Sequence, residues 1–153
     1  AGDGAFTLAL ADLLGEGATI HTIDRDGAAL ARGAAEARRR FPGVDVRPQT
    51  ADFTRPLALP PLDGLVMANA LHFVGDRDKE VLLRRLVAHL RPDGRFLLVE
   101  YDADRGNLWV PYPLSFDTWS ALAPRVGLAR PVLLGRHPSR FLHAIYAAAS
   151  GLA

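Results

Sequence analysis

Two hydrophobic periods alternate along the chain, one of about 3.6 residues that is typical of helices and one of about two residues that is typical of strands. The clearest helical pattern covers residues 78–90, where Leu82, Leu83 and Leu86 recur on one face while arginines point elsewhere. The pattern predicts helices at residues 5–14, between Asp26 and Pro42, at 78–90 and at 116–128. It predicts strands at residues 18–24, 44–50, 64–70, 95–101, 131–136 and 140–148.

Helices that alternate with strands in this way predict an α/β fold, an open and mostly parallel twisted sheet with helices on both faces. The run GLVMANA, residues 64–70, is apolar enough for a parallel strand buried on both faces. The last two strands are joined by a short turn at Pro138–Ser139, which predicts an antiparallel hairpin. Open sheets of this kind bind ligands beyond the carboxyl ends of their strands, where Asp24, Asp52, Asn69 and Glu100 are expected.

Composition narrows the functional classes. With 153 residues and 49% hydrophobic content, residues 1–153 fit one globular domain, and no segment is apolar enough to span a bilayer or to act as a signal peptide. We therefore expect a cytoplasmic protein without a membrane partner. The absence of cysteine excludes disulfides, thiolate metal sites and a cysteine nucleophile, and no acidic or histidine cluster has metal-ligand spacing, so we expect no metal. A net charge of +1 gives no footprint for nucleic acid, and we interpret residues 38–40, three arginines, as a solvated helix end.

The start of the chain carries the first candidate chemistry. Gly2 and Gly4 stand directly before a predicted helix, where glycines allow a tight turn and a close approach of the backbone to a ligand. Asp24, about 20 residues further on at a strand end, can accept hydrogen bonds from both hydroxyls of a ribose. Asp52 ends the next strand and can accept a hydrogen bond from an adenine amine, with Phe53 lining the ring.

Five segments in order resemble the motifs of class I S-adenosylmethionine-dependent methyltransferases, especially the small single-domain type. They are AGDGAFTLALADLL, IHTIDRD, TADF, LDGLVMANALHFV and LRPDGRFLLVEYD, and the resemblance covers essentially the whole chain. It implies S-adenosylmethionine as cofactor, with the glycines near its amino acid end, Asp24 at the ribose, Asp52 at the adenine amine and Asn69 beside the methionine part. The cofactor-binding residues we predict are Gly2, Asp3, Gly4, Asp24, Arg25, Asp52, Phe53 and Asn69.

The family also implies a sheet order of 3-2-1-4-5-7-6 with strand 7 antiparallel. Its motif normally has a first strand, an acidic residue and another glycine before the position of Gly2, and none of them is present here. That strand would lie between the strands that end at Asp24 and Asn69, where its loss leaves costly unpaired edges. We therefore expect a domain that is truncated at its amino terminus.

Methyl transfer from a sulfonium is an in-line displacement that depends chiefly on positioning, and a nucleophile of high pKa also benefits from a general base. His72 is the first candidate base, with packing beneath the next helix as its alternative role, and Glu100 and Tyr101 are second choices. The aromatic residues Trp109, Tyr112 and Phe116 are expected to line a binding site for a small-molecule acceptor, or else to pack in the core.

Three other functions compete with this hypothesis. A nicotinamide-dependent oxidoreductase would need glycine where Thr7 stands and a Tyr-x-x-x-Lys pair, although Lys79 is the only lysine. A DNA amino-group methyltransferase would carry an Asn/Asp-Pro-Pro-Tyr motif in place of residues 69–72, and cytosine carbon methylation needs a cysteine. A catalytically silent module that binds the cofactor remains the alternative from another class.

Overall fold

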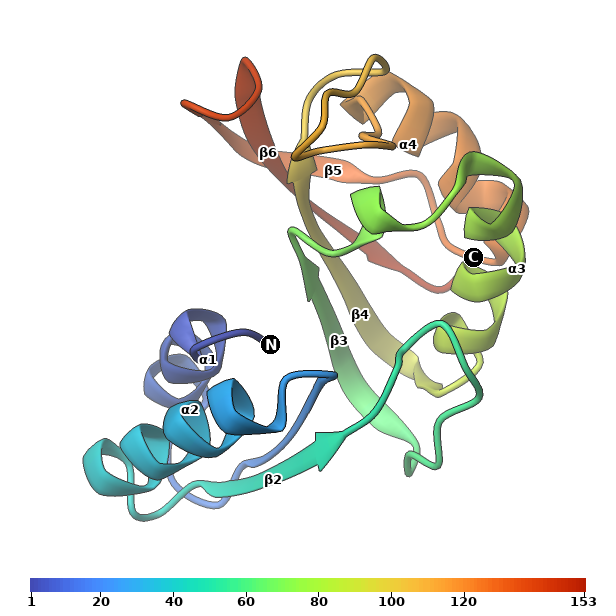
Figure 1. Ribbon diagram of the computed structural model, residues 1–153. Coiled ribbons are helices and arrows are strands. Elements are labelled where there is room, and N and C mark those ends of the chain that lie inside the picture. The colour runs from blue at the N-terminus through green and yellow to red at the C-terminus, as the bar shows by residue number, and fades with distance from the viewer. The chain divides into compact units, whose positions relative to one another are not determined.

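The computed structural model describes all residues from Ala1 to Ala153 (Figure 1). The chain divides into two compact units, residues 1–57 and residues 58–153, and each unit is described by itself below. None of the helices combines the length and the apolar character that crossing a bilayer requires.

The first unit is a parallel strand pair with two helices. Its elements are α1 (Ala5–Leu14), β1 (Thr19–Asp24), α2 (Gly27–Arg40) and β2 (Asp45–Thr50). β1 and β2 pair in parallel, with Thr19 opposite Asp45 and Asp24 opposite Thr50. Both strands therefore end at the same edge.

Small side chains form most of the core of the first unit. Its main buried cluster consists of Ala11, Ile20, Ala34, Ala37, Val44 and Val46. Because α1 and α2 meet through alanines, the large apolar residues Phe6, Leu13 and Leu14 of α1 stay exposed. The helix at residues 5–14 was predicted correctly. Its buried positions are Thr7 and Ala11 rather than its large apolar residues.

Local hydrogen bonds define both ends of α2. The Asp26 carboxylate accepts hydrogen bonds from the N–H groups of Ala28 and Ala29, as expected of a helix cap. At the other end, Arg38 donates to the carbonyl of Val46 over 2.7 Å and Arg39 pairs with Glu36. These arginines thus make local contacts at a helix carboxyl end, where the macrodipole favours positive charge.

The second unit is a four-stranded mixed sheet with helices on one face. Its elements are β3 (Leu62–Ala68), a 3₁₀ turn η1 (Leu71–Phe73), α3 (Asp76–Val87), β4 (Leu90–Tyr101), α4 (Phe116–Leu122), a second 3₁₀ turn η2 (Ala123–Val126), β5 (Val132–Pro138) and β6 (Ala144–Gly151). The strand order is β3-β4-β6-β5, in which β3 and β4 are parallel and the β4–β6 and β5–β6 pairs are antiparallel.

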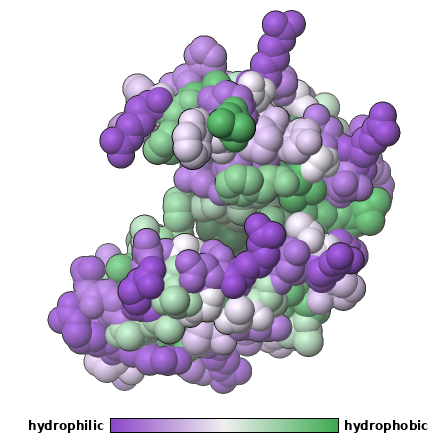
Figure 2. Space-filling model, viewed as in Figure 1, coloured by the Kyte–Doolittle hydropathy of each residue, from purple (hydrophilic) through white to green (hydrophobic).

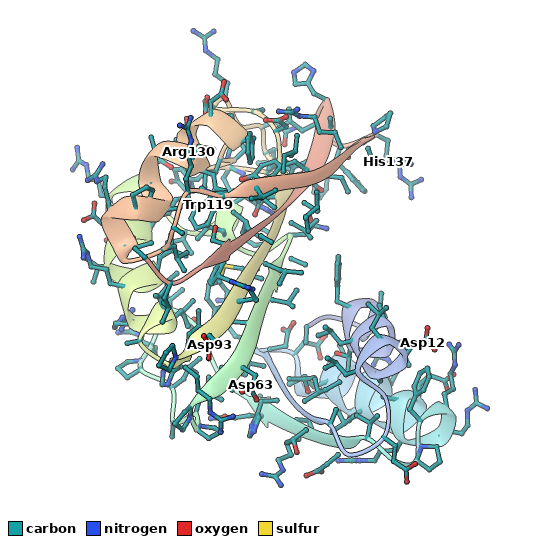
Figure 3. The ribbon with its side chains drawn as sticks, turned by 180° about the vertical axis from the view of Figure 1, so that it is seen from behind. Asp12, Asp63, Asp93, Trp119, Arg130 and His137 are labelled. Atoms are coloured by element: carbon teal, nitrogen blue, oxygen red, sulfur yellow. The ribbon has the colours of Figure 1, made fainter.

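One face of this sheet carries the core. Phe96, Leu98 and Glu100 alternate along β4 and are fully buried, and each lies opposite a buried residue of β6. Trp119 of α4 packs against Phe96, with 5.7 Å between ring centroids, and α3 lies on the same side of the sheet (Figures 1 and 3). In Figure 3, Asp63 and Asp93 mark the edge where β3 and β4 begin, and His137 marks the opposite end, at the tip of the β5–β6 hairpin.

Three details of the expected elements are wrong. The run 64–70 is not buried on both faces, since Met67 alone is buried in β3, and apolar atoms reach the surface of this unit (Figure 2). The physical reason is that the helices of this unit cover only one face of its sheet and that β3 is an edge strand (Figure 1). The third helix covers residues 76–87 rather than 78–90, and Leu90 is instead the first residue of β4, where it pairs with Leu62. Residues 139–143, rather than Pro138–Ser139, join the final hairpin.

The fold class itself is confirmed, as an α/β fold with a mixed sheet. Within each unit, the strand order, β2-β1 in the first and β3-β4-β6-β5 in the second, agrees with the matching part of the implied order. The antiparallel hairpin at the end of the chain is also confirmed.

Candidate functional site

In the first unit, two carboxylates stand at the ends of neighbouring strands. Asp24 is the last residue of β1, and Asp52 follows β2 by two residues. The N–H of Ala51 donates to the carbonyl of Asp24 over 2.9 Å, which continues the strand pairing to this point. The parallel register thus brings together the two aspartates that the sequence analysis placed at strand ends.

The two glycines of the first loop have different surroundings. Gly2 has a φ of +53°, and a Cβ atom built on it would have no neighbour within 4 Å, so its α carbon faces open space. Gly4 has a φ of +92°, and a Cβ there would lie 2.8 Å from the α carbon of Gly33 in α2. Gly2 is therefore free to meet a ligand, whereas Gly4 allows the loop and α2 to pack closely.

Asp24 ties this loop to β1. Its Oδ2 accepts hydrogen bonds from the amino group of Ala1 and the N–H of Gly2, and its Oδ1 accepts one from the N–H of Asp26. Burial raises the pKa of the Asp24 carboxyl, but these hydrogen bonds outweigh burial and hold the pKa well below its usual value. A carboxylate has about four acceptor positions, so one on Oδ1 is left for a ligand hydroxyl.

Asp52 has a similar free position. Its Oδ1 accepts hydrogen bonds from both the N–H and the hydroxyl of Thr54, at 2.9 and 2.7 Å, and these bonds lower the pKa of the Asp52 carboxyl. The charge of Arg25 lowers the same pKa further. Oδ2 of Asp52 accepts no hydrogen bond within the chain and can accept one from a ligand amine.

Three more predicted cofactor residues lie in this unit, and one of them is the exposed Arg25, whose charge acts on Asp52. Asp3 is exposed and accepts a hydrogen bond from Arg32 of α2 over 2.8 Å. Phe53 is half-buried beside Asp52. The described residues of the first unit thus offer a loop glycine, two ionised carboxylates and an aromatic ring at one strand edge.

In the second unit, His72 and Glu100 form a buried pair. Glu100 is the penultimate residue of β4 and is fully buried, and His72 in η1 is only 3% exposed. One carboxylate oxygen of Glu100 lies 2.8 Å from Nδ1 of His72 and accepts the N–H of Tyr101, while the other accepts the N–H of His72. Both Glu100 oxygens already accept backbone N–H groups, so we assign the ring proton of His72 to Nδ1, as the donor to Glu100, and the lone pair to Nε2.

The backbone explains why these residues meet. β3 and β4 are parallel neighbours, and the N–H of Asn69 donates to the carbonyl of Val99, so the chain leaves β3 next to the end of β4. Asn69 then adopts a left-handed conformation, with φ of +47°, which turns the chain into η1. Asparagine tolerates this conformation better than most residues.

Aromatic rings surround His72. The centroid of the Phe73 ring lies 4.1 Å from that of the His72 ring. The centroid of the Tyr101 ring lies 5.2 Å away, in an edge-to-face arrangement. Burial, together with the charge of Glu100, raises the pKa of the Tyr101 phenol. Tyr101 is therefore a proton donor near neutral pH rather than a base.

The three predicted acceptor-site aromatics do not share one environment. Trp109 is 72% exposed and Tyr112 is 46% exposed, whereas Phe116 begins α4 and packs edge to face on the buried Tyr146. Backbone hydrogen bonds bring Tyr112 to the pair described above, since its N–H donates to the carbonyl of His72 over 3.0 Å. Phe116 therefore supports the fold beneath this surface.

The sequence matches the methyltransferase domain family over residues 1–96, which is more than half of the chain. The chain belongs to this family. The resemblance to class I S-adenosylmethionine-dependent methyltransferases is thereby confirmed, and S-adenosylmethionine is the cofactor of that class. No protein of curated function matches the sequence significantly.

Solved structures with the same fold are widespread but distant in sequence. The N-methyltransferase NodS of Bradyrhizobium japonicum, solved with S-adenosyl-L-homocysteine, is 17% identical with a TM-score of 0.72, over 98% of this chain and 73% of that one. The magnesium protoporphyrin IX methyltransferase of Synechocystis, with bound S-adenosylmethionine, is 15% identical with a TM-score of 0.72, over 99% and 66%. The 1,6-didemethyltoxoflavin-N1-methyltransferase of Burkholderia thailandensis, with its substrate and S-adenosylhomocysteine, is 20% identical with a TM-score of 0.67, over 99% and 79%. At these identities the likeness establishes the fold.

Two residues at these sites were not predicted. Gly33 interrupts an otherwise helical pattern, and a lone glycine inside a helix is a sign of close packing. Lys79 takes the first position of the apolar stripe of α3, where a buried cation is unexpected. Both signals were readable in the sequence, although their partners were not.

Proposed function

We propose that this chain catalyses S-adenosylmethionine-dependent methyl transfer to a nucleophilic oxygen, nitrogen or carbon of a small molecule, and that residues 1–153 act as one domain. The observation that carries the proposal is the His72–Glu100 pair, whose free Nε2 is flanked by aromatic rings. A silent cofactor-binding module would have no need to hold a histidine in one tautomer.

The cofactor is assigned to residues that have free binding capacity. Gly2 faces open space, Asp24 has one acceptor position left for a ribose hydroxyl, and Oδ2 of Asp52 can accept an adenine amine. Asp3, Gly4, Arg25, Phe53 and Asn69 complete the proposed set. When bound, S-adenosylmethionine supplies an electrophilic methyl group on its sulfonium sulfur.

His72 is proposed as the general base. Its Nε2 accepts the proton of the acceptor O–H or N–H, which becomes more acidic as that oxygen or nitrogen gives electron density to the new bond, and the buried carboxylate of Glu100 stabilises the resulting imidazolium. The carboxyl group of Glu100 bonds both the ring nitrogen Nδ1 and the backbone N–H of His72, so the proposed base is oriented before an acceptor arrives.

A small acceptor with an apolar body fits this surface best. Phe73, the next residue after His72, and Tyr112, whose N–H donates to the carbonyl of His72, both expose aromatic area, and Trp109 exposes more three residues before Tyr112. Aromatic side chains favour flat, apolar ligands. The structural neighbours include two enzymes named for small-molecule substrates, a magnesium porphyrin and a toxoflavin precursor, which agrees with this class.

The test measures transfer of a radiolabelled methyl group from S-adenosylmethionine to a panel of phenols, carboxylic acids and N-heterocycles. Wild type should methylate at least one acceptor, and His72→Gln, whose amide can still donate to Glu100 but cannot act as a base, should lower the rate by about 10²-fold or more. Arg77→Met is the matched control, since Arg77 is exposed on α3 and makes no hydrogen bond. Full activity in His72→Gln would refute the base, and cofactor binding without turnover across the panel would favour the silent module.

A further inference from the structure

Lys79 is the only lysine in the chain, and it is one of the most buried side chains. All the other cationic residues among the 18 Lys and Arg are arginine. Lys79 is 2% exposed and lies on the inner face of α3, in line with Leu82, Leu83 and Leu86. A cation is rarely buried without a partner, because its desolvation is costly.

The ammonium of Lys79 has two close acceptors. Its Nζ lies 2.5 Å from Oδ1 of Asp76, one turn earlier in α3, and 2.7 Å from the backbone carbonyl of Tyr112. Asp104 adds a further negative charge. Burial raises the pKa of the Asp104 carboxyl, but hydrogen bonds from Ser115 and the charge of Lys79 outweigh burial and hold this pKa below its usual value. The cation is thus compensated from α3 and from the segment that precedes α4.

Hydrogen bonds hold the backbone of Tyr112 on both sides of its α carbon. The carbonyl of Tyr112 accepts from Lys79, and its N–H donates to the carbonyl of His72 over 3.0 Å. The flanking residues Val110 and Leu114 are buried and anchor the segment on either side. The backbone of Tyr112 therefore contacts His72 through its N–H and Lys79 through its carbonyl, one on each side of the same α carbon.

We infer that Lys79 is a positioning residue, a clamp that holds the segment 107–115 against His72 and so sets where an acceptor meets the base. The role of Lys79 in acceptor positioning rests on the proposed function, whereas its contacts with the segment 107–115 are a property of the fold. A lysine suits the place because its compact ammonium fits between two acceptors, whereas the planar guanidinium of arginine is larger. This accounts for the single lysine in a chain that otherwise uses arginine.

Hydrogen–deuterium exchange of the full chain tests the clamp without any acceptor. Lys79→Met removes the donor to Tyr112, and we expect the amides of residues 107–115 to exchange about tenfold faster or more, as the loss of one charge-assisted hydrogen bond predicts. The amides of β4 should keep their wild-type rates. Lys79→Gln can still donate one hydrogen bond, so its exchange rates at residues 107–115 should lie between those of wild type and Lys79→Met. Arg77→Met, which removes a cation from the same helix turn, should match wild type.

The contrary results are equally definite. Unchanged exchange at 107–115 in Lys79→Met would overturn the clamp, and equal acceleration throughout residues 58–153 would reduce Lys79 to a general stabilising role. If Lys79→Met does not fold, acetylation of the only side-chain amine replaces it. Tyr112→Pro lacks the N–H that bonds His72, so Lys79 should acetylate about tenfold faster there than in wild type, and equal rates would refute the clamp.

The acceptor readout separates this inference from the proposed function. On any acceptor that wild type methylates, Lys79→Met should raise the acceptor KM by about tenfold while kcat and cofactor affinity change much less. An unchanged KM would overturn the positioning role even if exchange is faster. If no acceptor is methylated by wild type, the proposed function fails, and the exchange experiment still decides the clamp.

Discussion

Replacing Glu100 by glutamine is the sharpest test of the buried pair, because it changes one atom of a group that accepts three hydrogen bonds. The carboxylate meets three donors, the N–H of His72, the N–H of Tyr101 and Nδ1 of His72. An amide has one oxygen and one NH₂, so in either orientation the NH₂ faces at least one backbone N–H. No water can relieve this, since Glu100 is fully buried.

The structure supports an estimate of the cost. One buried backbone donor left without an acceptor costs about 1–3 kcal/mol, and the NH₂ group itself also loses a partner. We therefore expect Glu100→Gln to destabilise the second unit by about 2–4 kcal/mol, or roughly 4–16 °C in Tm for a chain of this length.

Urea unfolding followed by tryptophan fluorescence measures this cost in the right place, since Trp109 and Trp119 are the only tryptophans and both lie in the second unit. The midpoint should fall with an unchanged m value. Glu80→Gln is the control, because Glu80 is bonded to Arg84 and Arg125 near the surface and its loss should shift the midpoint less. A Glu100→Gln midpoint equal to that of wild type would refute the hydrogen-bond network as described.

Three further predictions concern Gly33, Asn69 and the buried tyrosines. Gly33→Ala would bring a Cβ atom to 3.1 Å from the α carbon of Gly4, so we expect weaker S-adenosylhomocysteine binding in a calorimetric titration. A variant that binds normally and is about 1 kcal/mol more stable would contradict the close packing of Gly33 on Gly4. Asn69→Ala should lower Tm because φ is positive there, whereas Asn69→Gly should preserve Tm and lose cofactor affinity, and equal Tm for both would argue against backbone strain. Burial raises the pKa values of the Tyr101 and Tyr146 phenols above the ordinary 10.0, so their contribution to stability is complete below that pH and is lost as pH rises above it. Absorbance at 295 nm should therefore increase less at pH 10 in the native chain than in urea, and identical titrations would contradict the burial of these phenols.

Local patterns predicted the fold well where the residues of a helix or strand are themselves enough to specify it. Residues 5–14 form α1 as expected, since the helical period and Gly15 act within the segment. The strand-end positions of Asp24 and Asp52 followed from strand length and order alone. Burial was harder, because an apolar run does not reveal whether β3 has neighbours on both sides.

The candidate site could be predicted only in part for a similar reason. His72 and Glu100 were each candidates, but their hydrogen bond joins residues 28 apart in sequence through the crossover between β3 and β4. The Lys79 clamp joins residues 33 apart through a loop with no regular period. Such pairs depend on tertiary structure, and sequence patterns describe only local structure.

Binding of S-adenosylhomocysteine to the full chain tests the central claim most directly. Isothermal titration should give about one equivalent per chain, and Asp24→Ala should weaken binding by at least about tenfold because a ribose hydroxyl loses a charged acceptor. Asp12→Ala is the control, an exposed aspartate of α1 that is assigned to no site (Figure 3), and it should bind as wild type does. Absence of binding to wild type, or equal affinity in Asp24→Ala, would contradict the assignment of this chain's cofactor site.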